Sequence, residues 1–408
     1  MPALNTHAAR LSSRIAALDN LILSVVGLII SLILRLRLFK IQSADYDWFL
    51  SPWYDYIRDH GGFRALKDDF SNYTPPYLYL MTIATYLPIP KLAAIKWISV
   101  VFDFVLAALV TLLVRLKYED KTLWMLSFFV TLFTPTVFFN SALWGQCDAI
   151  YTSALLASVY FAIKRKPRAA AIFLGVALTV KLQAVFLFPL FLLLYLKKEM
   201  PVKVFLLIPA VYVLLILPAW LMGRPFVDLL LIHFSHAGVY TSRLVLNAPN
   251  LYQWLPYHRV IEKGSLFFAL AMIYLFCLIG YKSRVELEKN IIIKIATVSA
   301  ILVPFVLPHM HERYFFPADA LSLVYAFYFP RFFIVPLLVI TASFFSYIPV
   351  LFFTSVKPTG IPYMAGLMAL ALIITTVDLV RSLYPGLQSA NRNLNHRDTA
   401  DLREAVKK

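Results

Sequence analysis

Cysteine is scarce in this sequence, since its 408 residues include only Cys147 and Cys277. The two lie far apart, each within or beside an apolar run. Metal and redox motifs built on cysteine pairs need close spacing, and an isolated cysteine usually behaves as a small buried hydrophobic residue. We therefore predict no cysteine-based metal or redox centre.

Charge is scarce as well. Charged residues make up 15% of the chain and hydrophobic residues 61%, with a mean hydropathy of +0.74. A soluble domain is typically about 45–50% apolar and about 25% charged. This composition excludes a soluble enzyme carrying a single anchor, and it predicts an all-α integral membrane protein with many spans.

Acidic residues are few beside basic ones, at 22 against 38, so the formal net charge is +16. Nucleic-acid binding would require a soluble basic domain, and the sequence has none. The basic residues instead fall in short segments between apolar runs, as the positive-inside rule predicts, and they can attract anionic lipids. We expect membrane lipids, and no nucleic acid, among the partners.

The apolar runs define about thirteen candidate spans, with an expected range of 11–14. They cover residues 18–39, 77–87, 92–116, 123–139, 149–163, 169–180, 184–196, 202–221, 265–281, 291–307, 314–329, 332–353 and 361–383. At about 1.5 Å per residue, the run at 77–87 reaches only part of a roughly 30 Å bilayer core, so we predict a short or re-entrant helix there. The short runs on either side of Lys181 predict a broken helical pair.

Basic residues also set the predicted orientation. Arg10 and Arg14 place the N-terminus in the cytoplasm. We predict one transmembrane domain at residues 1–383, followed by a cytoplasmic tail at 384–408. The external side then receives residues 41–76, 144–148, 223–263 and 309–313.

The first external segment, residues 41–76, carries its own helix signal. Ser51 can cap a helix that begins at Pro52, and Gly61-Gly62 can end it. The aromatic residues between them predict a juxtamembrane helix that lies in the interface plane with its aromatic face toward the membrane.

Two carboxylates, Asp45 and Asp47, follow the first span directly. Placing an ionisable group next to a bilayer costs free energy, so such a group suggests a functional site by default. An extended chain would place both on one face, whereas a helix would separate them.

More polar residues fall on the same predicted side. Asn72-Tyr73-Thr74 matches a glycosylation acceptor, but the prolines that follow favour a structural turn. A buried lysine costs several kcal/mol unless it meets an anion, so Lys181 either binds one or snorkels to the interface. The candidate substrate-binding residues here are Tyr73, Trp144, Gln146, Asp148, Lys181 and Gln183.

A second cluster, His309, His311, Glu312 and Arg313, lies between two late apolar runs. A zinc pair on one helix face needs histidines at i and i+4, and these are at i and i+2. A phosphate site is favoured instead, because arginine offers planar bidentate hydrogen bonds and histidine or lysine adds charge.

Together these motifs resemble the GT-C superfamily of membrane glycosyltransferases, which take a sugar from a polyprenyl- or dolichyl-phosphate donor. The prokaryotic proteins similar to GPI mannosyltransferase II are the nearest group. The resemblance rests on Asp45-Tyr46-Asp47, the helix at 52–62, and the motifs at 72–76, 144–148, 181–183 and 309–314, in that order. It implies an external active site, an essential acidic residue in the first external loop and a lipid-linked donor.

Such families carry out one-step inverting transfer, which needs a base for the acceptor hydroxyl and stabilisation of the leaving phosphate. We take Asp45 as the base, with Asp47 second and Asp148 third. Lys181, Arg313, His309 and His311 would receive the phosphate charge.

The resemblance also sets the expected partners. It favours mannose as the sugar and leaves the acceptor open among a glycan, a lipid and a protein. We expect a monomer with no cofactor. No divalent metal is expected, because the cationic residues can neutralise the phosphate, although Asp45 and Asp47 could hold Mg²⁺ or Mn²⁺ through water.

A transporter or flippase of lipid-linked sugars is the main alternative. Transporters show internal repeats and interrupted spans near the midplane. This sequence shows no convincing repeat, and its charged clusters gather at one predicted face. A structural scaffold would leave those clusters without a role, so an enzyme is favoured.

Overall fold

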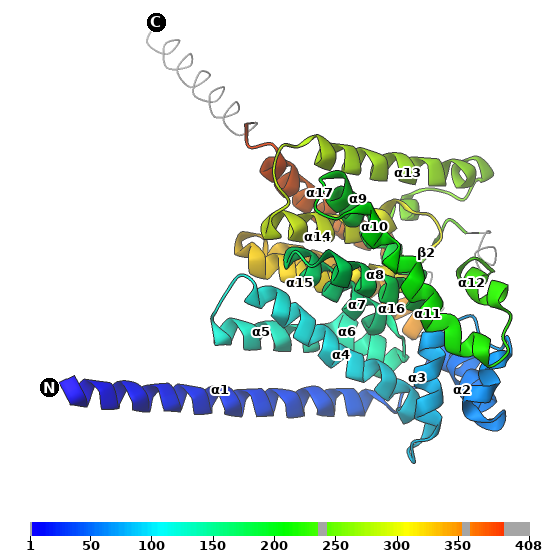
Figure 1. The fold of residues 1–408 in the computed structure, drawn as a ribbon, viewed down its shortest axis with the longest axis horizontal. Coiled ribbons are helices and arrows are strands. Elements are labelled where there is room, and N and C mark those ends of the chain that lie inside the picture. The colour runs from blue at the N-terminus through cyan, green and yellow to red at the C-terminus, as the bar shows by residue number, and fades with distance from the viewer. Residues whose placement is uncertain (1, 236–242, 353–359, 387–408) are drawn as a thin grey trace, which may run out of the picture. The chain divides into compact units, whose positions relative to one another are not determined.

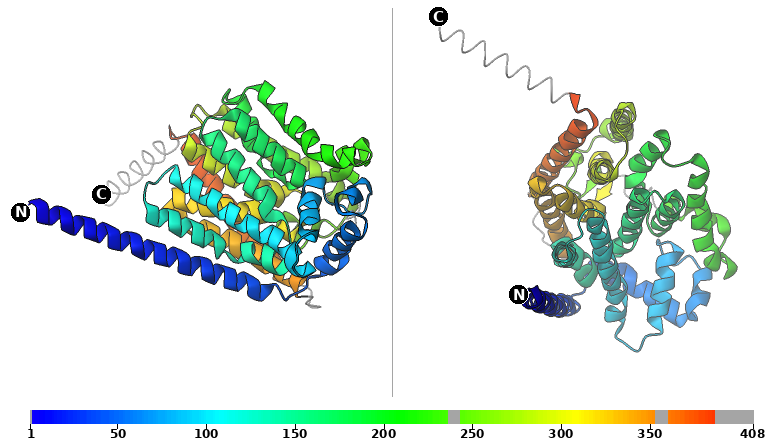
Figure 2. Two further views of the ribbon diagram at one scale, coloured as in Figure 1. Left: turned by 60° about the horizontal axis from the view of Figure 1, so that its bottom comes forward. Right: turned by 60° about the vertical axis from the view of Figure 1, so that its left-hand side comes forward.

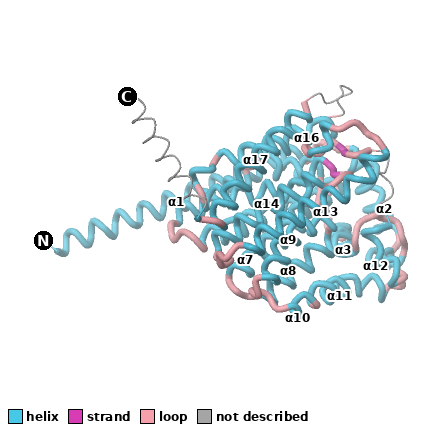
Figure 3. Tube along the Cα trace, turned by 90° about the horizontal axis from the view of Figure 1, so that it is seen from above, coloured by secondary structure: helices cyan, strands magenta, loops and turns pink. Residues whose placement is uncertain are grey.

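The protein is described by a computed structural model covering residues 2–235, 243–352 and 360–386. The described residues are helical almost throughout, with two strands of two residues each, so the all-α prediction is confirmed (Figure 3). Most of the predicted cytoplasmic tail, from residue 387 onward, lies outside the described residues.

The apolar runs predicted from the sequence all fall on helices. Within the described ranges, seven helices are long and apolar enough to cross a membrane, or eight if one bent pair counts as a span. They are Asp19–Leu38, Lys91–Arg115, Val202–Leu221, Arg259–Lys282, Lys289–Val306, Pro330–Leu351 and Ile361–Leu383. Three shorter apolar helices are Asp148–Ile163, Pro167–Val180 and Leu182–Leu196. The chain is therefore a multi-pass membrane protein.

The chain divides into two compact units, each described by itself. Unit 1 comprises Met1–Tyr160, Val176–Leu182 and Val211–Ala237, and unit 2 comprises Phe161–Gly175, Gln183–Ala210 and Gly238–Lys408. The prediction of one transmembrane domain over residues 1–383 stays a prediction.

Unit 1 contains the first helices of the chain (Figure 1). They are α1 (Pro2–Leu38), α2 (Ser51–Asp59), α3 (Pro75–Thr85), α4 (Lys91–Arg115), α5 (Lys121–Leu132), α6 (Pro135–Phe138) and α12 (Phe226–Ser235), with the π-helical turns η1 (Tyr46–Leu50) and η3 (Phe139–Trp144) and the 3₁₀ turn η2 (Gly62–Lys67). Three helices contribute residues to both units: α7 (Asp148–Ile163), α8 (Pro167–Val180) and α11 (Leu207–Leu221). The sequence did not predict α12.

Contacts with neighbouring helices of unit 1 hold α1 and fix where it ends. The helix α4 packs against α5, and α1 lies beside α5 and η3 (Figure 2). Lys96 of α4 is buried, and its Nζ donates to the carbonyl oxygens of Leu38 at 3.1 Å, Phe39 at 3.3 Å and Ile41 at 2.5 Å. The last carbonyls of a helix have no partner inside it, and a lysine can satisfy them. This contact holds the chain at the point where it leaves α1 for Asp45.

The predicted span at 123–139 is broken. Helix α5 ends at Leu132 and the chain resumes at Pro135 with a bend of 49°. Thr134 is extended, as the residue before a proline prefers to be. The turn η3 then leads to Gly145, whose φ of 80° favours glycine, and a β-carbon placed there would lie a tight 3.3 Å from the side chain of Leu50.

The predicted juxtamembrane helix is α2, and it differs from the prediction in two respects. Ser51 does not cap it, because η1 runs into α2 without an extended residue between them. Trp53, Tyr54 and Ile57 are buried within the protein, where α2 packs on α3 and η2, so the aromatic face covers protein rather than lipid.

Unit 2 is built around α14 (Lys289–Val306), which is buried from Ile291 to Val306 and packs against several neighbours. The other elements are α9 (Phe188–Leu196), α10 (Val202–Phe205), α13 (Arg259–Lys282), α15 (Phe316–Tyr328), α16 (Ile334–Leu351) and α17 (Ile361–Leu383), with 3₁₀ turns η4 (Leu182–Leu187), η5 (Leu251–Trp254), η6 (Glu312–Phe315) and η7 (Pro330–Phe332). The strands β1 (Val245–Leu246) and β2 (Met310–His311) pair in parallel.

Candidate active site

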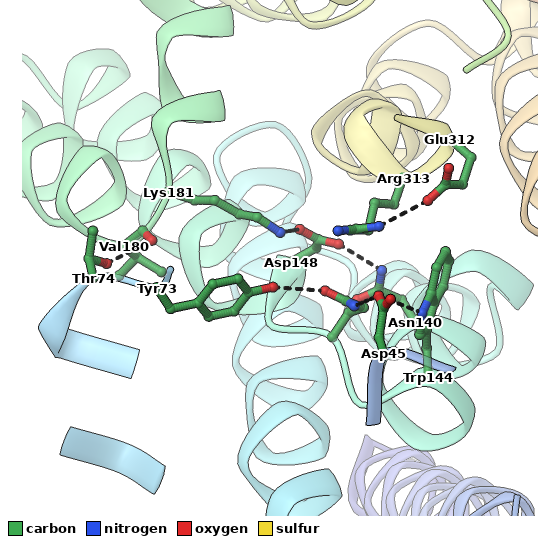
Figure 4. A network of polar contacts seen from close by, with 11 residues as sticks. Asp45, Tyr73, Thr74, Asn140, Trp144, Asp148, Val180, Lys181, Glu312 and Arg313 are labelled. Atoms are coloured by element: carbon green, nitrogen blue, oxygen red, sulfur yellow. Dashed lines mark hydrogen bonds and ion pairs between the residues drawn. The ribbon is translucent and has the colours of Figure 1, made fainter. Parts of the chain in front are cut away.

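The predicted site residues divide between the two units. Unit 1 brings together six of them: Asp45, Tyr73, Trp144, Gln146, Asp148 and Lys181. Figure 4 labels all of these except Gln146. Unit 2 holds Gln183, His309, His311, Glu312 and Arg313.

Asp45 is half-buried and is held by neutral donors. Its Oδ2 accepts a hydrogen bond from the indole Nε1 of Trp144 at 3.0 Å and another from Nε2 of Gln146. Trp144 and Gln146 are themselves buried. These two contacts fix the direction of the carboxylate.

These donors are tied in turn to other segments of unit 1. The hydroxyl of Tyr73 donates to Oε1 of Gln146 at 3.0 Å, which orients the amide so that its Nε2 faces Asp45 (Figure 4). Ser43 donates through Oγ to the carbonyl of Trp144 at 2.9 Å and accepts from the amide of Tyr46 at 3.2 Å. The segment that carries Asp45 is thus bound directly to the turn that carries its donors.

Asp148 and Lys181 form an ion pair within this cluster. Asp148, the first residue of α7, is completely buried, and its Oδ1 meets Nζ of Lys181. Its Oδ2 accepts from Nδ2 of Asn140 at 2.8 Å. The Lys181 Nζ also lies 5.8 Å from the ring centres of Tyr73 and Tyr151. The side chain of Lys181 is only 11% exposed, so the structure favours a buried, paired lysine over a snorkelling one.

Asn140 is a site residue that the sequence interpretation missed. It is buried in η3, and besides its contact with Asp148 its carbonyl accepts the amide of Gln146 at 2.9 Å. The available signal was a polar amide directly after an apolar run and a few residues before Gly145.

Asp47 does not join the cluster. Residues 46–50 form a π-helical turn and not an extended segment, so the side chains of Asp45 and Asp47 do not share one face. The Asp47 side chain is exposed, and no side-chain hydrogen bond to it is found within the described residues.

The late cluster in unit 2 has its own geometry. His309 has a φ of 60°, its amide donates to the carbonyl of Leu244 at 2.7 Å, and its Nδ1 lies 2.6 Å from the carbonyl of Arg243. These contacts and the β1–β2 pairing fix the extended segment that precedes η6.

Arg313 forms an ion pair with its neighbour in the same cluster. Its Nη1 donates to Oε1 of the buried Glu312 at 2.9 Å, while Nδ1 of His311 lies 3.9 Å from Oε2 of Glu312. Gln183, in η4, has a buried Oε1 for which the described part of the chain supplies no hydrogen-bond donor.

A metal site is not evident from side-chain clustering. Among residues 2–235, 243–352 and 360–386, no group of three or more histidine, cysteine, aspartate or glutamate side chains is placed to hold a metal ion.

Unit 1 therefore couples a carboxylate held by neutral donors to a buried aspartate–lysine pair. The first can accept a proton from a hydroxyl, since a general base must keep a basic oxygen in a defined direction. The second offers an ammonium group that Asp148 holds in place and that can attract an anion.

Residues 70–311, more than half of the chain, match the family model described as glycosyltransferase family 87. The matched region includes Tyr73, Gln146, Asp148 and Lys181, whereas Asp45 lies before it. No curated protein matches the chain.

Proposed function

Because the chain belongs to glycosyltransferase family 87, a GT-C-like family of membrane glycosyltransferases, we propose that it moves mannose from a polyprenyl-phosphate donor to a glycan, lipid or protein acceptor. The proposed reaction is an inverting transfer on the extracytoplasmic face of the cytoplasmic membrane, by a monomer. The observation that carries the proposal is the orientation of Asp45 by Trp144 and Gln146. The resemblance to GPI mannosyltransferase II supports mannose as the sugar.

In this proposal Asp45 is the general base. The acceptor hydroxyl oxygen attacks the anomeric carbon, its proton passes to the Asp45 carboxylate, and the bond to the polyprenyl phosphate breaks. One carboxylate is enough for a one-step inverting displacement, whereas a retaining reaction would need a second as nucleophile. Asp47 is the second choice, and its exposed position makes it the natural comparison.

Lys181 is proposed to receive the charge of the leaving phosphate. Asp148 holds the ammonium group in place, and Asn140 holds Asp148. As charge develops on the phosphate in the transition state, a preorganised cation stabilises it without rearrangement.

An apolar cavity in unit 2 supports the proposal that the donor is lipid-linked. It has a volume of about 530 Å³, and its lining includes Phe188, Leu192, Tyr195, Phe205, Cys277 and Leu307. Leu307, which lines the cavity, stands two positions before His309 in the chain. An isoprenoid tail in such a cavity would leave equally apolar lipid chains, so packing against the lining, and not transfer out of water, would hold it there.

Replacing Arg313 by lysine tests the proposed contact with the donor phosphate. Lysine keeps the charge but loses the planar pair of donors, so we expect the donor KM to rise about tenfold, as the loss of one charged hydrogen bond predicts. Initial rates over a range of polyprenyl-phosphate mannose concentrations measure it. The matched control is Arg331→Lys, because Arg331 also belongs to unit 2 but bonds Asp378. An unchanged KM for Arg313→Lys would remove Arg313 from the proposal.

Chelation tests the proposal that no divalent metal takes part. We expect transfer activity to survive exhaustive EDTA treatment, because Lys181 and Arg313 supply positive charge for the phosphate. Loss of activity that added Mg²⁺ or Mn²⁺ restores would contradict this and would make Asp45 and Asp47 candidate ligands.

A transporter or flippase remains the alternative to test. A transferase makes a new glycosidic bond, whereas a flippase moves the intact donor. Mass spectrometry of lipid-linked glycans from cells with and without the protein separates the two. A product one hexose larger that requires the protein supports transfer, and an unchanged glycan profile opposes it.

A further inference from the structure

Two charges lie completely buried within predicted spans of unit 1, outside the cluster that carries the chemistry. Nε of Arg35, near the end of α1, lies 2.9 Å from Oδ2 of Asp103 in the middle of α4, and both side chains have no exposed surface. Charged residues inside membrane spans are rare and expensive. A buried ion pair is seldom more stable than well-packed apolar residues of the same size. Its presence here therefore calls for a function other than stability.

Both members of the pair also bond to the broken span. Nη2 of Arg35 donates to the carbonyl of Leu132 at 3.0 Å, and Nη1 donates to Oγ of Ser31 at 2.7 Å. Oδ2 of Asp103 accepts from Oγ of Ser141 at 2.5 Å. Leu132 is the last residue of α5 and Ser141 lies in η3, so the pair holds both sides of the 49° break.

The element held in this way carries the donors of the site. Asn140, next to Ser141, bonds Asp148, and Trp144 at the end of η3 bonds Asp45. The carbonyl of Ser141 also accepts the amide of Gly145 at 2.9 Å, at the start of the turn that leads to Gln146. A π-helical turn after a proline break lacks the regular ladder of a longer helix, so its position depends on contacts from outside.

We propose that Arg35 and Asp103 are positioning residues, which act through Ser141 to set η3 so that Trp144 and Asn140 meet Asp45 and Asp148. The inference rests on the proposed role of Asp45 as general base. It differs from a purely structural role, because it predicts an effect on turnover that passes through Trp144.

Ser141→Ala tests the link most cleanly, since it removes one hydroxyl and leaves the Arg35–Asp103 pair intact. We expect kcat for mannose transfer to fall about tenfold while the donor KM stays within about twofold, as a small misplacement of catalytic groups predicts. The matched control is Ser99→Ala. Ser99 is equally buried one turn before Asp103 on α4, and its hydroxyl has no hydrogen bond within the described residues. This variant should keep the wild-type kcat.

A double-mutant cycle with Trp144→Phe tests the route. If Ser141 acts through Trp144, then adding Ser141→Ala to Trp144→Phe should lower kcat by no more than about twofold further. A full tenfold further loss would mean that the two act independently, and it would overturn the proposal. An unchanged kcat for Ser141→Ala alone would do the same.

A second measurement does not depend on the reaction. Cys147 follows η3 and is buried, and in a Cys277→Ala background it is the one cysteine in the chain. Loosening η3 should raise the rate at which N-ethylmaleimide alkylates Cys147, by about fivefold or more in Ser141→Ala and not in Ser99→Ala.

The paired replacement Arg35→Met/Asp103→Leu provides a second variant that is expected to fold. It removes both charges together, so no charge is left buried without its partner. Faster Cys147 alkylation with an unchanged unfolding temperature supports the proposal. An unchanged alkylation rate in this variant and in Ser141→Ala overturns it, whether or not mannose is the sugar transferred.

Discussion

Asp45→Asn is expected to lower turnover by about 10²–10⁴, the usual contribution of a general base, with the fold intact. Asparagine keeps the shape of the side chain, and its carbonyl oxygen can still accept from Trp144 Nε1 and Gln146 Nε2. It loses only the basic oxygen that would take the acceptor proton. Steady-state rates at saturating donor measure the effect, and the unfolding temperature in detergent checks the fold.

Asp47→Asn is the matched control for this prediction. Asp47 lies two residues away, inside the π-helical turn that Asp45 precedes, and its side chain is exposed. Its replacement should leave turnover within about threefold of wild type. If instead Asp45→Asn retains turnover within about threefold and Asp47→Asn does not, the base is Asp47 and the contacts of Asp45 are structural.

Lys181→Met should cause the second large effect. It breaks the buried ion pair with Asp148, and breaking such a pair by removing one partner typically costs about 3–5 kcal/mol of unfolding free energy. We expect a lower unfolding temperature and no detectable transfer. Thermal unfolding of the purified protein in one detergent, alongside a transfer assay, measures both.

The double variant Lys181→Met/Asp148→Asn separates these two effects. It removes both charges, and the asparagine can still accept from Nδ2 of Asn140. Stability should return to near that of wild type while transfer stays lost, because the cation for the phosphate is still missing. Recovery of transfer in the double variant would show that Lys181 serves only to neutralise Asp148.

The helices could be predicted from the sequence because long apolar runs carry a strong signal in a chain of this composition. The breaks within these helices were harder to predict. Residues 123–139 read as one apolar run, yet Pro135 splits it, since the ring removes a donor and disfavours helix at Thr134. The short helix α12 was missed because it lies in a segment assigned to an external loop.

The members of the site could be predicted better than their partners. Asp45, Trp144, Gln146, Asp148 and Lys181 were all candidates, because polar residues at the ends of spans are costly. The pairing of Lys181 with Asp148 could not be predicted, since it joins residues 33 positions apart, one at the start of α7 and the other just after α8. The aromatic face of α2 was assigned to lipid, because a sequence does not distinguish burial in lipid from burial in protein.

Arg35 and Asp103 illustrate the same limit. Each stands well inside a predicted span, and a charge at that depth indicates a partner without identifying it. The structure supplies the partner, the carbonyl of Leu132 and the hydroxyl of Ser141.

The most direct measurement is the fate of the donor sugar with the purified protein. Radiolabelled polyprenyl-phosphate mannose is mixed in detergent, without any membrane gradient, with the protein and a membrane extract from cells that lack it. We predict that wild-type protein moves label from the polyprenyl phosphate into a new product and that Asp45→Asn does not. Label that stays on the donor with wild-type protein, together with movement of intact donor between the leaflets of reconstituted vesicles, would contradict the proposed transfer of mannose from this donor.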